Sequence, residues 1–269
     1  MRSNVRAVLI GMAASLMGLN AQAALIPVAG GLGVYDDVNN VTWTADGNLF
    51  ATQAASYSGG YSAFVAAVIA ASGGVIRDTP NIYDTVPYSG NYTLSASDFD
   101  TGGAYTGTLN WYGAKAWANY LNAINYAGSN SWGLPTTVDS NLSAGDPNGA
   151  AASPSQYSSQ MALLFYGGLG QVVNNSITAT HNSGYELFTN LKSTAYWSGT
   201  EYSASPGHVW YFNTNAGRQD YGLKFYTPYY ALAVAPGDIS AVPEPGVAWL
   251  LGTGLLGLAC LRRRKAQKS

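Results

Sequence analysis

The sequence predicts an α+β domain between two apolar termini, and three observations support this class. Apolar residues recur at helical spacing in residues 114–124 and again in residues 153–168. Apolar and polar residues alternate through residues 195–236, a pattern typical of short strands. The helical segments precede the strand-like segment instead of alternating with it, which favours α+β over α/β.

The N-terminus has the parts of a secretory signal peptide. A positively charged start is followed by an apolar stretch, residues 7–19, and by a small-residue cleavage motif. Signal peptidase is therefore expected to remove residues 1–23. The residues that define the expected cleavage site are Ala21, Ala23 and Ala24.

The first part of the mature chain predicts a hairpin and a short helix. Residues 30–50 contain two strand-like runs around a turn rich in Asp and Asn. Residues 62–72 are apolar and end at two glycines, which suits a helix, although their Val and Ile also suit a strand. Residues 74–107 are rich in Tyr, Asp, Ser and Gly without a clear period, so we interpret them as an insertion or as long loops.

Two further helices are predicted from their apolar faces. The aromatic residue of the first, Trp117, is expected in the core and not in a ligand site. The second is marked by a capping box with proline at the first helical position, residues 153–156, and ends at two glycines. The apolar faces consist of Ala114, Trp117, Ala118, Leu121 and Ile124 in the first helix and of Tyr157, Met161, Leu164 and Phe165 in the second.

Four strands are predicted after residue 192. The segments AYWSGTEYS, HVWYFN, YGLKFYT and YYALAVAP are separated by short turns, which favours an antiparallel meander. Alternation along each strand requires about half of its aromatic rings to lie in the core. We assign Trp197 and Trp210 to that buried half.

Charge and cysteine content exclude several classes of protein. Seven of the twelve Lys and Arg residues lie in the two termini, so the mature body is strongly acidic. Phosphate backbones require a cationic surface, and a nucleic-acid partner is therefore excluded. The single cysteine, Cys260, lies in the C-terminal apolar run, so the mature domain has no disulfide and depends on its core for stability.

The C-terminus, VPEPGVAWLLGTGLLGLACLRRRK, combines a proline-flanked glutamate, an apolar run and a basic cluster. As a helix, residues 246–261 span about 24 Å, slightly less than a hydrocarbon core of about 30 Å. The basic cluster holds its own end on the cytoplasmic side, so the body lies outside. An ordinary stop-transfer anchor has the same parts. The residues that define the motif are Val242, Pro243, Glu244, Pro245, Arg262, Arg263 and Arg264.

This order of parts resembles the PEP-CTERM sorting signal of Gram-negative bacteria. The resemblance implies that residues 242–269 insert transiently into the inner membrane through residues 246–261. It also implies that an exosortase, a membrane transpeptidase, removes this helix. The mature protein, residues 24–241, would then reach the cell envelope, the outer surface or the extracellular matrix.

Three blocks of the body, WGLPT at residues 132–136, YWSGTE at 196–201 and AVAPGD at 233–238, resemble the Lcl C-terminal domain family. The resemblance implies a compact fold like that of C-type lectins and formylglycine-generating enzymes, with two main helices packed on a twisted antiparallel sheet. The founding example is an adhesin domain that binds glycosaminoglycans. The family has arginine where this chain has Gly133 and Ala235, so contacts made by those arginines are missing here.

The residues favour binding over catalysis. The mature domain lacks the thiols of formylglycine chemistry and the usual hydrolase and metalloprotease motifs, so we expect no enzyme activity. A glycan-active enzyme is the alternative, and it requires opposed carboxylates such as Asp98 with Asp100, or Glu186 with Glu201.

No cofactor is required on this interpretation, but loop carboxylates offer the oxygen ligands that Ca²⁺ prefers. Turn formation explains the same residues equally well. The candidate metal ligands are Asp36, Asp37, Asp46, Asp98 and Asp100.

Stacking of sugar rings on exposed aromatic side chains is the expected mode of ligand binding. We therefore expect an adhesin or biofilm matrix protein that binds extracellular polysaccharide, with a purely structural, self-associating protein as the alternative. The candidate glycan-binding residues are Tyr202, Tyr211, Tyr226, Tyr229 and Tyr230.

Overall fold

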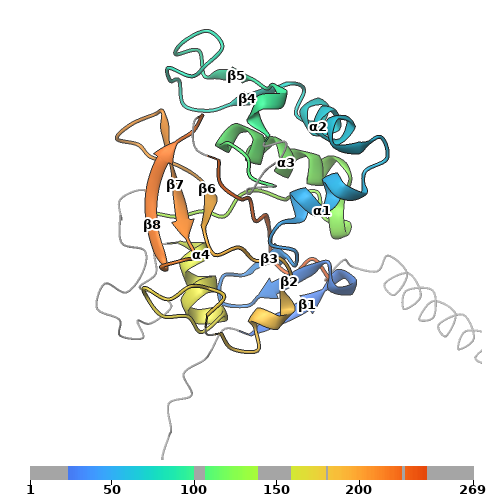
Figure 1. Cartoon of the computed structure of the whole chain (residues 1–269), viewed down its shortest axis with the longest axis vertical. Coiled ribbons are helices and arrows are strands. Elements are labelled where there is room, and N and C mark those ends of the chain that lie inside the picture. Colours follow the sequence, from blue (N-terminus) through green and yellow to red (C-terminus); the bar gives the residue numbers. More distant parts are fainter. Residues whose placement is uncertain (1–23, 100–106, 139–158, 180, 226–227, 241–269) are drawn as a thin grey trace, which may run out of the picture.

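The structure, a computed structural model, has a mixed α+β fold with three small antiparallel sheets. Figure 1 shows helices α1, α2 and α3 grouped with the hairpin β4–β5 at one end, and strands β1 to β3 with α4 at the other. The expected signal peptide and sorting signal lie outside the described part of the chain. The described residues are 24–99, 107–138, 159–179, 181–225 and 228–240.

The first sheet contains the predicted hairpin. Strands β2, Gly33–Asp36, and β3, Val41–Thr44, pair antiparallel around the Asp- and Asn-rich turn, which confirms the prediction. Strand β1, Leu25–Val28, extends the sheet on one side, and β9, Val234–Pro236, pairs with β3 on the other. The end of the last predicted strand therefore pairs with the start of the chain, while Tyr230, at its beginning, forms a parallel bridge with Tyr196 of the meander.

The second sheet is a three-stranded meander. It consists of β6, Ala195–Glu201, β7, His208–Asn213, and β8, Arg218–Leu223, in sequence order. The pairing of β6 with β7 shifts between Trp197 and Glu201, so the end of β6 is displaced from its ideal register. Three of the four predicted late strands thus form the expected meander.

Three helices pack at one end of the molecule. Helix α2, Gly60–Ala71, and helix α3, Trp111–Ala123, confirm the predictions for these segments, whereas α1, Leu49–Ser56, was not predicted. Helix α3 begins where the side chain of Asn110 accepts a hydrogen bond from the Gly113 backbone N–H. Trp117 is buried as expected, but Ile124 lies beyond the end of the helix and is exposed.

The helix predicted from residue 153 is described only from Ser159 onwards. Its capping box lies outside the described residues, and α4, Gln160–Ala162, begins after Ser159, whose extended backbone and side-chain oxygen cap the helix. A π-helical turn, Leu163–Gly168, continues it. The expected stripe residues Met161, Leu164 and Phe165 are buried, while Tyr157 lies outside the described residues.

The segment 74–107, interpreted as an insertion or long loops, contains a short hairpin in the structure. Strands β4, Val75–Arg77, and β5, Asn91–Thr93, form a hairpin whose inward residues Ile76 and Tyr92 are buried. Phe99 stacks on Phe50 of α1, with ring centroids 5.9 Å apart. This segment is therefore part of the core, although residues 100–106 are not described.

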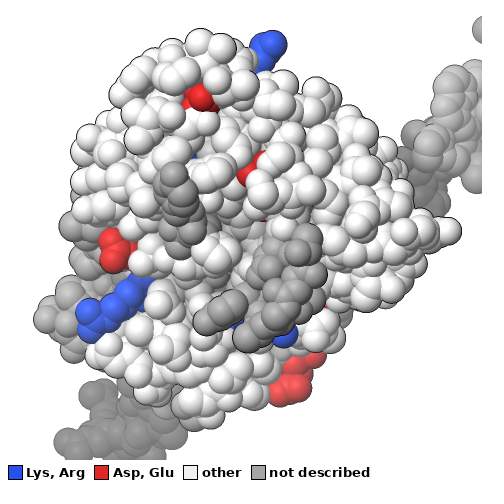
Figure 2. Space-filling view, turned by 45° about the horizontal axis from the view of Figure 1, so that its top comes forward, with Lys and Arg blue, Asp and Glu red and all other residues white. Residues whose placement is uncertain are grey.

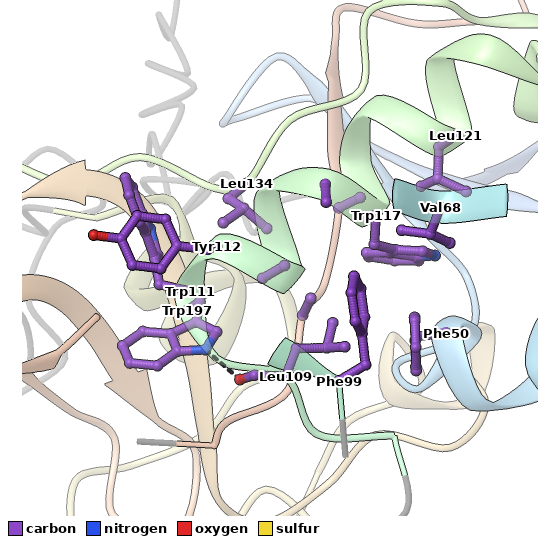
Figure 3. Packing of buried hydrophobic residues seen from close by; sticks show 14 of the residues in the cluster. Phe50, Val68, Phe99, Leu109, Trp111, Tyr112, Trp117, Leu121, Leu134 and Trp197 are labelled. Atoms are coloured by element: carbon purple, nitrogen blue, oxygen red, sulfur yellow. Dashed lines mark hydrogen bonds between the residues drawn. The ribbon is translucent and has the colours of Figure 1, made fainter. Parts of the chain in front are cut away.

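Two apolar clusters lie on opposite sides of the chain that forms β6, β7 and residues 230–235. Figure 3 shows part of the larger cluster, in which the Trp197 indole donates a hydrogen bond of 2.8 Å to the Leu109 carbonyl. Alternation divides the strands between the clusters: Trp197 belongs to the larger and Tyr196 to the smaller. The expected burial of Trp197 and Trp210 is confirmed.

No single described helix has both the length and the hydropathy needed to cross a membrane. Only α1 and α2 taken together reach those limits, and they are bent by 120°.

Candidate functional site

A cluster of rings at one end of the meander forms the aromatic patch, defined as Tyr202, His208, Trp210 and Tyr221. The rings of Tyr202 and Tyr221 stack with centroids 4.2 Å apart and planes at 9°. Trp210 meets both edge-on, and it is buried, whereas Tyr221 is 37% exposed. The patch therefore has a buried indole as its base and two tyrosine rings nearer the solvent.

Strand pairing positions these rings. Trp210 lies directly opposite Tyr221 in the β7–β8 pair, and His208 lies two residues away on the same face of β7. Tyr202 follows the end of β6 and is held by its backbone N–H, which donates to the His208 carbonyl. The Nδ1 atom of His208 lies 2.8 Å from the Ser205 hydroxyl, which gives the patch a polar edge.

The other candidate glycan-binding residues lie elsewhere. Tyr211 and Tyr229 are half-buried neighbours of Trp197 on the opposite face of the meander, and burial raises the pKa of both hydroxyls. Tyr230 is 6% exposed, so the expectation of an accessible ring is wrong there: its backbone bonds to Ala195 and its ring packs against Tyr196. Tyr226 lies outside the described residues.

The candidate calcium ligands near the N-terminus each accept a hydrogen bond from the backbone, Asp36 and Asp46 in local turns and Asp37 from the start of the mature chain. The Asp36 carboxylate accepts hydrogen bonds from the Val38 and Asn39 backbone N–H groups, as an Asx turn requires. Asp37 accepts a bond from the Ala24 backbone, and Asp46 accepts one from the Asn48 backbone. These backbone hydrogen bonds thus account for the three carboxylates.

Of the candidate ligands in the third acidic segment, only Asp98 lies in the described residues. Asp98 is buried and accepts hydrogen bonds from the Tyr92 hydroxyl at 2.6 Å and the Asn110 amide at 2.7 Å, while Asp100 is not described. Within the described ranges, no three His, Cys, Asp or Glu residues lie close enough to hold a metal ion. The carboxylates of Glu186 and Glu201 have different partners, His181 for the first and Lys224 for the second.

The most concentrated group of charges was not predicted from the sequence. We call it the buried charge cluster, and it consists of Lys224, Asp78 and Glu201. The Lys224 Nζ atom lies 2.6 Å from Asp78 Oδ2 and 2.7 Å from Glu201 Oε2. The Lys224 and Asp78 side chains are fully buried, and that of Glu201 is 24% exposed. A sequence signal existed, because this lysine sits in the apolar segment YGLKFYT of a chain poor in cations.

The ends of three strands bring this cluster together. Asp78 directly follows β4, Glu201 is the last residue of β6, and Lys224 directly follows β8. The Lys224 backbone is held on both sides, since its N–H donates to the Gly207 carbonyl and its carbonyl accepts from Trp111 N–H. The position of Lys224 is therefore set by the sheet and by the start of α3.

Aromatic residues at the start of α3 surround the cluster. The Lys224 ammonium lies 4.8 Å from the centre of the Trp111 ring, and the Tyr112 hydroxyl donates to Asp78 Oδ2 at 3.3 Å. Figure 3 places Trp111 and Tyr112 side by side on this helix. Burial raises the pKa of Asp78 despite the opposing effect of Lys224. Burial also acts to raise the pKa of Glu201, but hydrogen bonding and charge from Lys224 outweigh it and lower that pKa.

The two positions at which the Lcl pattern has arginine, Gly133 and Ala235, differ in the space around them. A Cβ atom at Gly133 would meet nothing within 4 Å, so this position has room for a side chain. Ala235, in contrast, is fully buried in β9 opposite Thr42. An arginine at position 235 would require a buried partner that the present packing does not supply.

Comparison with known proteins identifies the C-terminus. Residues 241–265 match the PEP-CTERM protein-sorting motif and lie outside the described residues. No curated protein and no solved structure matches the chain. The resemblance of the body to the Lcl C-terminal family and to C-type lectins therefore rests on the sequence blocks alone. The chain carries a PEP-CTERM sorting motif, which marks it as an exported surface protein that an exosortase processes.

Proposed function

We propose that the exported domain binds extracellular polysaccharide without catalysis, as an adhesin or matrix protein. The stacked pair of Tyr202 and Tyr221 is the observation that supports this function. Flat apolar ring faces with hydroxyl groups at their edges suit the apolar faces and hydroxyls of sugars. The buried Trp210 beneath the pair holds both rings in place, which reduces the entropy lost on binding.

A neutral polysaccharide suits this surface better than a polyanion. The mature region has only five of the twelve Lys and Arg residues, and it lacks the two arginines of the Lcl pattern. The face shown in Figure 2 is mostly uncharged, with isolated basic and acidic residues. Polyanions require a cationic surface, so hydrogen bonding and stacking would supply the affinity here.

The cellular route completes the proposal. Signal peptidase would release residues 1–23 after export, and the PEP-CTERM segment would hold the protein transiently in the inner membrane through residues 246–261. Exosortase cleavage would then release an Lcl-type domain to the envelope or biofilm matrix of a Gram-negative bacterium. Calcium is not required for this binding mode.

A polysaccharide-binding screen tests the function. The purified mature protein would be incubated with neutral and anionic polysaccharides, with calcium and with a chelator. Tyr221→Ala and Tyr202→Ala should each weaken binding several-fold to about tenfold, as expected for loss of one stacked ring. Tyr88→Ala is the matched control, because Tyr88 is 66% exposed and lies outside the patch.

Equal binding by all three variants would contradict the assignment of the patch. Failure of the folded protein to bind any polysaccharide would contradict the function itself and favour the structural, self-associating alternative. Loss of binding with the chelator would add a calcium site to the proposal.

A further inference from the structure

We propose that Lys224 and Asp78 become joined by an intramolecular isopeptide bond, with Glu201 as the residue that transfers the proton. In the buried charge cluster, two carboxyl groups lie within hydrogen-bond distance of one amine nitrogen. The Lys224 Nζ atom lies 2.6 Å from Asp78 Oδ2 and 2.7 Å from Glu201 Oε2. This modification site is independent of the aromatic patch and of polysaccharide binding.

Burial favours the uncharged form of the carboxyl group that amide formation requires. The Lys224 and Asp78 side chains are fully buried, and the Trp111 ring lies 4.8 Å from the amine nitrogen. A charge taken out of water is costly, so burial favours the protonated form of the Asp78 carboxyl group. The raised pKa of Asp78 has the same cause and the same direction.

The two oxygen atoms of Asp78 have different surroundings. Oδ2 accepts hydrogen bonds from the Asn81 amide at 2.9 Å and from the Tyr112 hydroxyl at 3.3 Å. Oδ1 is buried and has no hydrogen-bond partner among the described residues. The Oδ2 donors are placed to stabilise negative charge in a tetrahedral intermediate, as an oxyanion hole does, whereas Oδ1 is the atom free to leave.

Glu201 is the base and not the second electrophile. The Thr79 backbone N–H donates to both of its carboxylate oxygens at 3.2 Å, and its side chain is partly exposed to solvent. The hydrogen bonds from Thr79 and the partial exposure to solvent both favour the ionised form. Burial acts to raise the pKa of Glu201, but hydrogen bonding and charge from Lys224 outweigh it and lower that pKa. An ionised carboxylate resists attack by an amine but accepts a proton readily.

The reaction balances without any other reactant. The neutral Lys224 amine attacks Cγ of the Asp78 carboxyl group, which carries its proton on Oδ1, and a C–N bond forms while the negative charge develops on Oδ2. Glu201 accepts a proton from Nζ and delivers it to the Oδ1 hydroxyl, which leaves as water when the C–Oδ1 bond breaks. Glu201 ends ionised, as it began, and nothing is oxidised or reduced. The products are one secondary amide and one water molecule.

The bond would give the exported domain a covalent cross-link, which it cannot obtain from cysteine. The single cysteine lies in the C-terminal tail, so the mature domain has no disulfide. Asp78 and Lys224 are 146 positions apart, and their link would tie the β4–β5 hairpin to the end of the meander.

Mass spectrometry of the purified protein tests the bond directly. The expected result is an intact mass lower than the sequence mass by one water molecule, and a proteolytic peptide in which Asp78 and Lys224 are joined. Trypsin should also fail to cleave after Lys224, because its amine is acylated. A full sequence mass in the folded protein, with cleavage after Lys224, would overturn the proposal.

Variants identify the roles of the three residues. Asp78→Ala and Glu201→Gln should each restore the full mass, whereas Lys192→Arg, the control at another lysine, should keep the loss of water. Asp78→Asn should lose ammonia in place of water, because the nitrogen of the side-chain amide leaves as ammonia when the amine attacks. A peptide that joins Lys224 to Glu201 would contradict the assignment of Asp78. A variant that fails to fold leaves the test intact, because the wild-type mass alone decides it.

Discussion

Replacement of Glu201 by Gln should prevent formation of the isopeptide bond between Lys224 and Asp78 and lower the stability of the domain. The substitution keeps the size of the side chain and leaves the Lys224–Asp78 ion pair, at 2.6 Å, in place. It removes the group that accepts the proton in amide formation and, with it, the ion pair between Glu201 and Lys224. The domain should therefore fold but lack the isopeptide bond.

The magnitude follows from the length of the loop that the bond closes. A cross-link between residues 146 positions apart lowers the entropy of the unfolded chain by an amount worth about 5 kcal/mol in the chain-entropy treatment of cross-links. For a domain of this size, about 2–4 °C in Tm per kcal/mol gives a loss of about 10–20 °C. The denatured chain should also become more open, so the denaturant m value should rise.

Denaturant unfolding followed by tryptophan fluorescence measures both quantities. Glu186→Gln is the matched control, because Glu186 carries a side chain that is 71% exposed and lies outside the buried charge cluster. A lower midpoint with an unchanged m value would indicate an ordinary ion pair and refute the cross-link. An unchanged midpoint would show that the cluster contributes nothing to stability.

Three further outcomes are expected. Gly113→Ala should destabilise the domain by about 1–3 kcal/mol, because its Cβ would lie 2.5 Å from the backbone carbonyl oxygen of Asp98, whereas Gly133→Ala should be near neutral in the same denaturant titration. Burial, with a smaller effect from a nearby aspartate, raises the pKa of Tyr126 from 10.0 to about 12. Its stabilising effect is therefore complete below pH 10 and lost as the pH rises through about 12, and Tyr126→Phe should flatten the dependence of unfolding free energy on pH in that window. Pro243→Ala with Glu244→Ala should leave the uncleaved protein in the membrane fraction, and normal release on an immunoblot would refute the role of the motif.

Much of the fold could be predicted because it depends on neighbouring residues. The hairpin of β2 and β3, the helix around Trp117 and the three strands of the meander follow from turn chemistry and from periods of 3.6 and 2. The burial of Trp197 and Trp210 follows from alternation, since half of the rings in such strands must face the core.

The remainder depends on contacts between distant segments. Strand β9 pairs with β3 across nearly the whole mature chain, and no local pattern distinguishes that pairing from a fourth meander strand. Tyr230 was expected on the surface because the register of its segment was unknown, and the structure places it in the core. Helix α4 starts at Gln160 because the Ser159 side chain accepts a hydrogen bond from the Ala162 backbone N–H.

The buried charge cluster could not be predicted from the sequence for the same reason. Asp78, Glu201 and Lys224 come from three separate strand ends, and only the tertiary structure places them around one another. Their residue types gave no motif of regular spacing. The sorting signal is the opposite case, because all its parts are contiguous and the sequence identifies it without any structure.

Polysaccharide binding is most directly tested by co-sedimentation of the mature protein with exopolysaccharide from the cells that secrete it. Wild-type protein and Tyr221→Ala would be compared at equal concentration, with circular dichroism to confirm that both are folded. We predict saturable sedimentation of the wild type and a several-fold weaker response of the variant, because one face of the Tyr202 stack is lost. Equal sedimentation of both proteins, or of neither, would contradict binding through the aromatic patch.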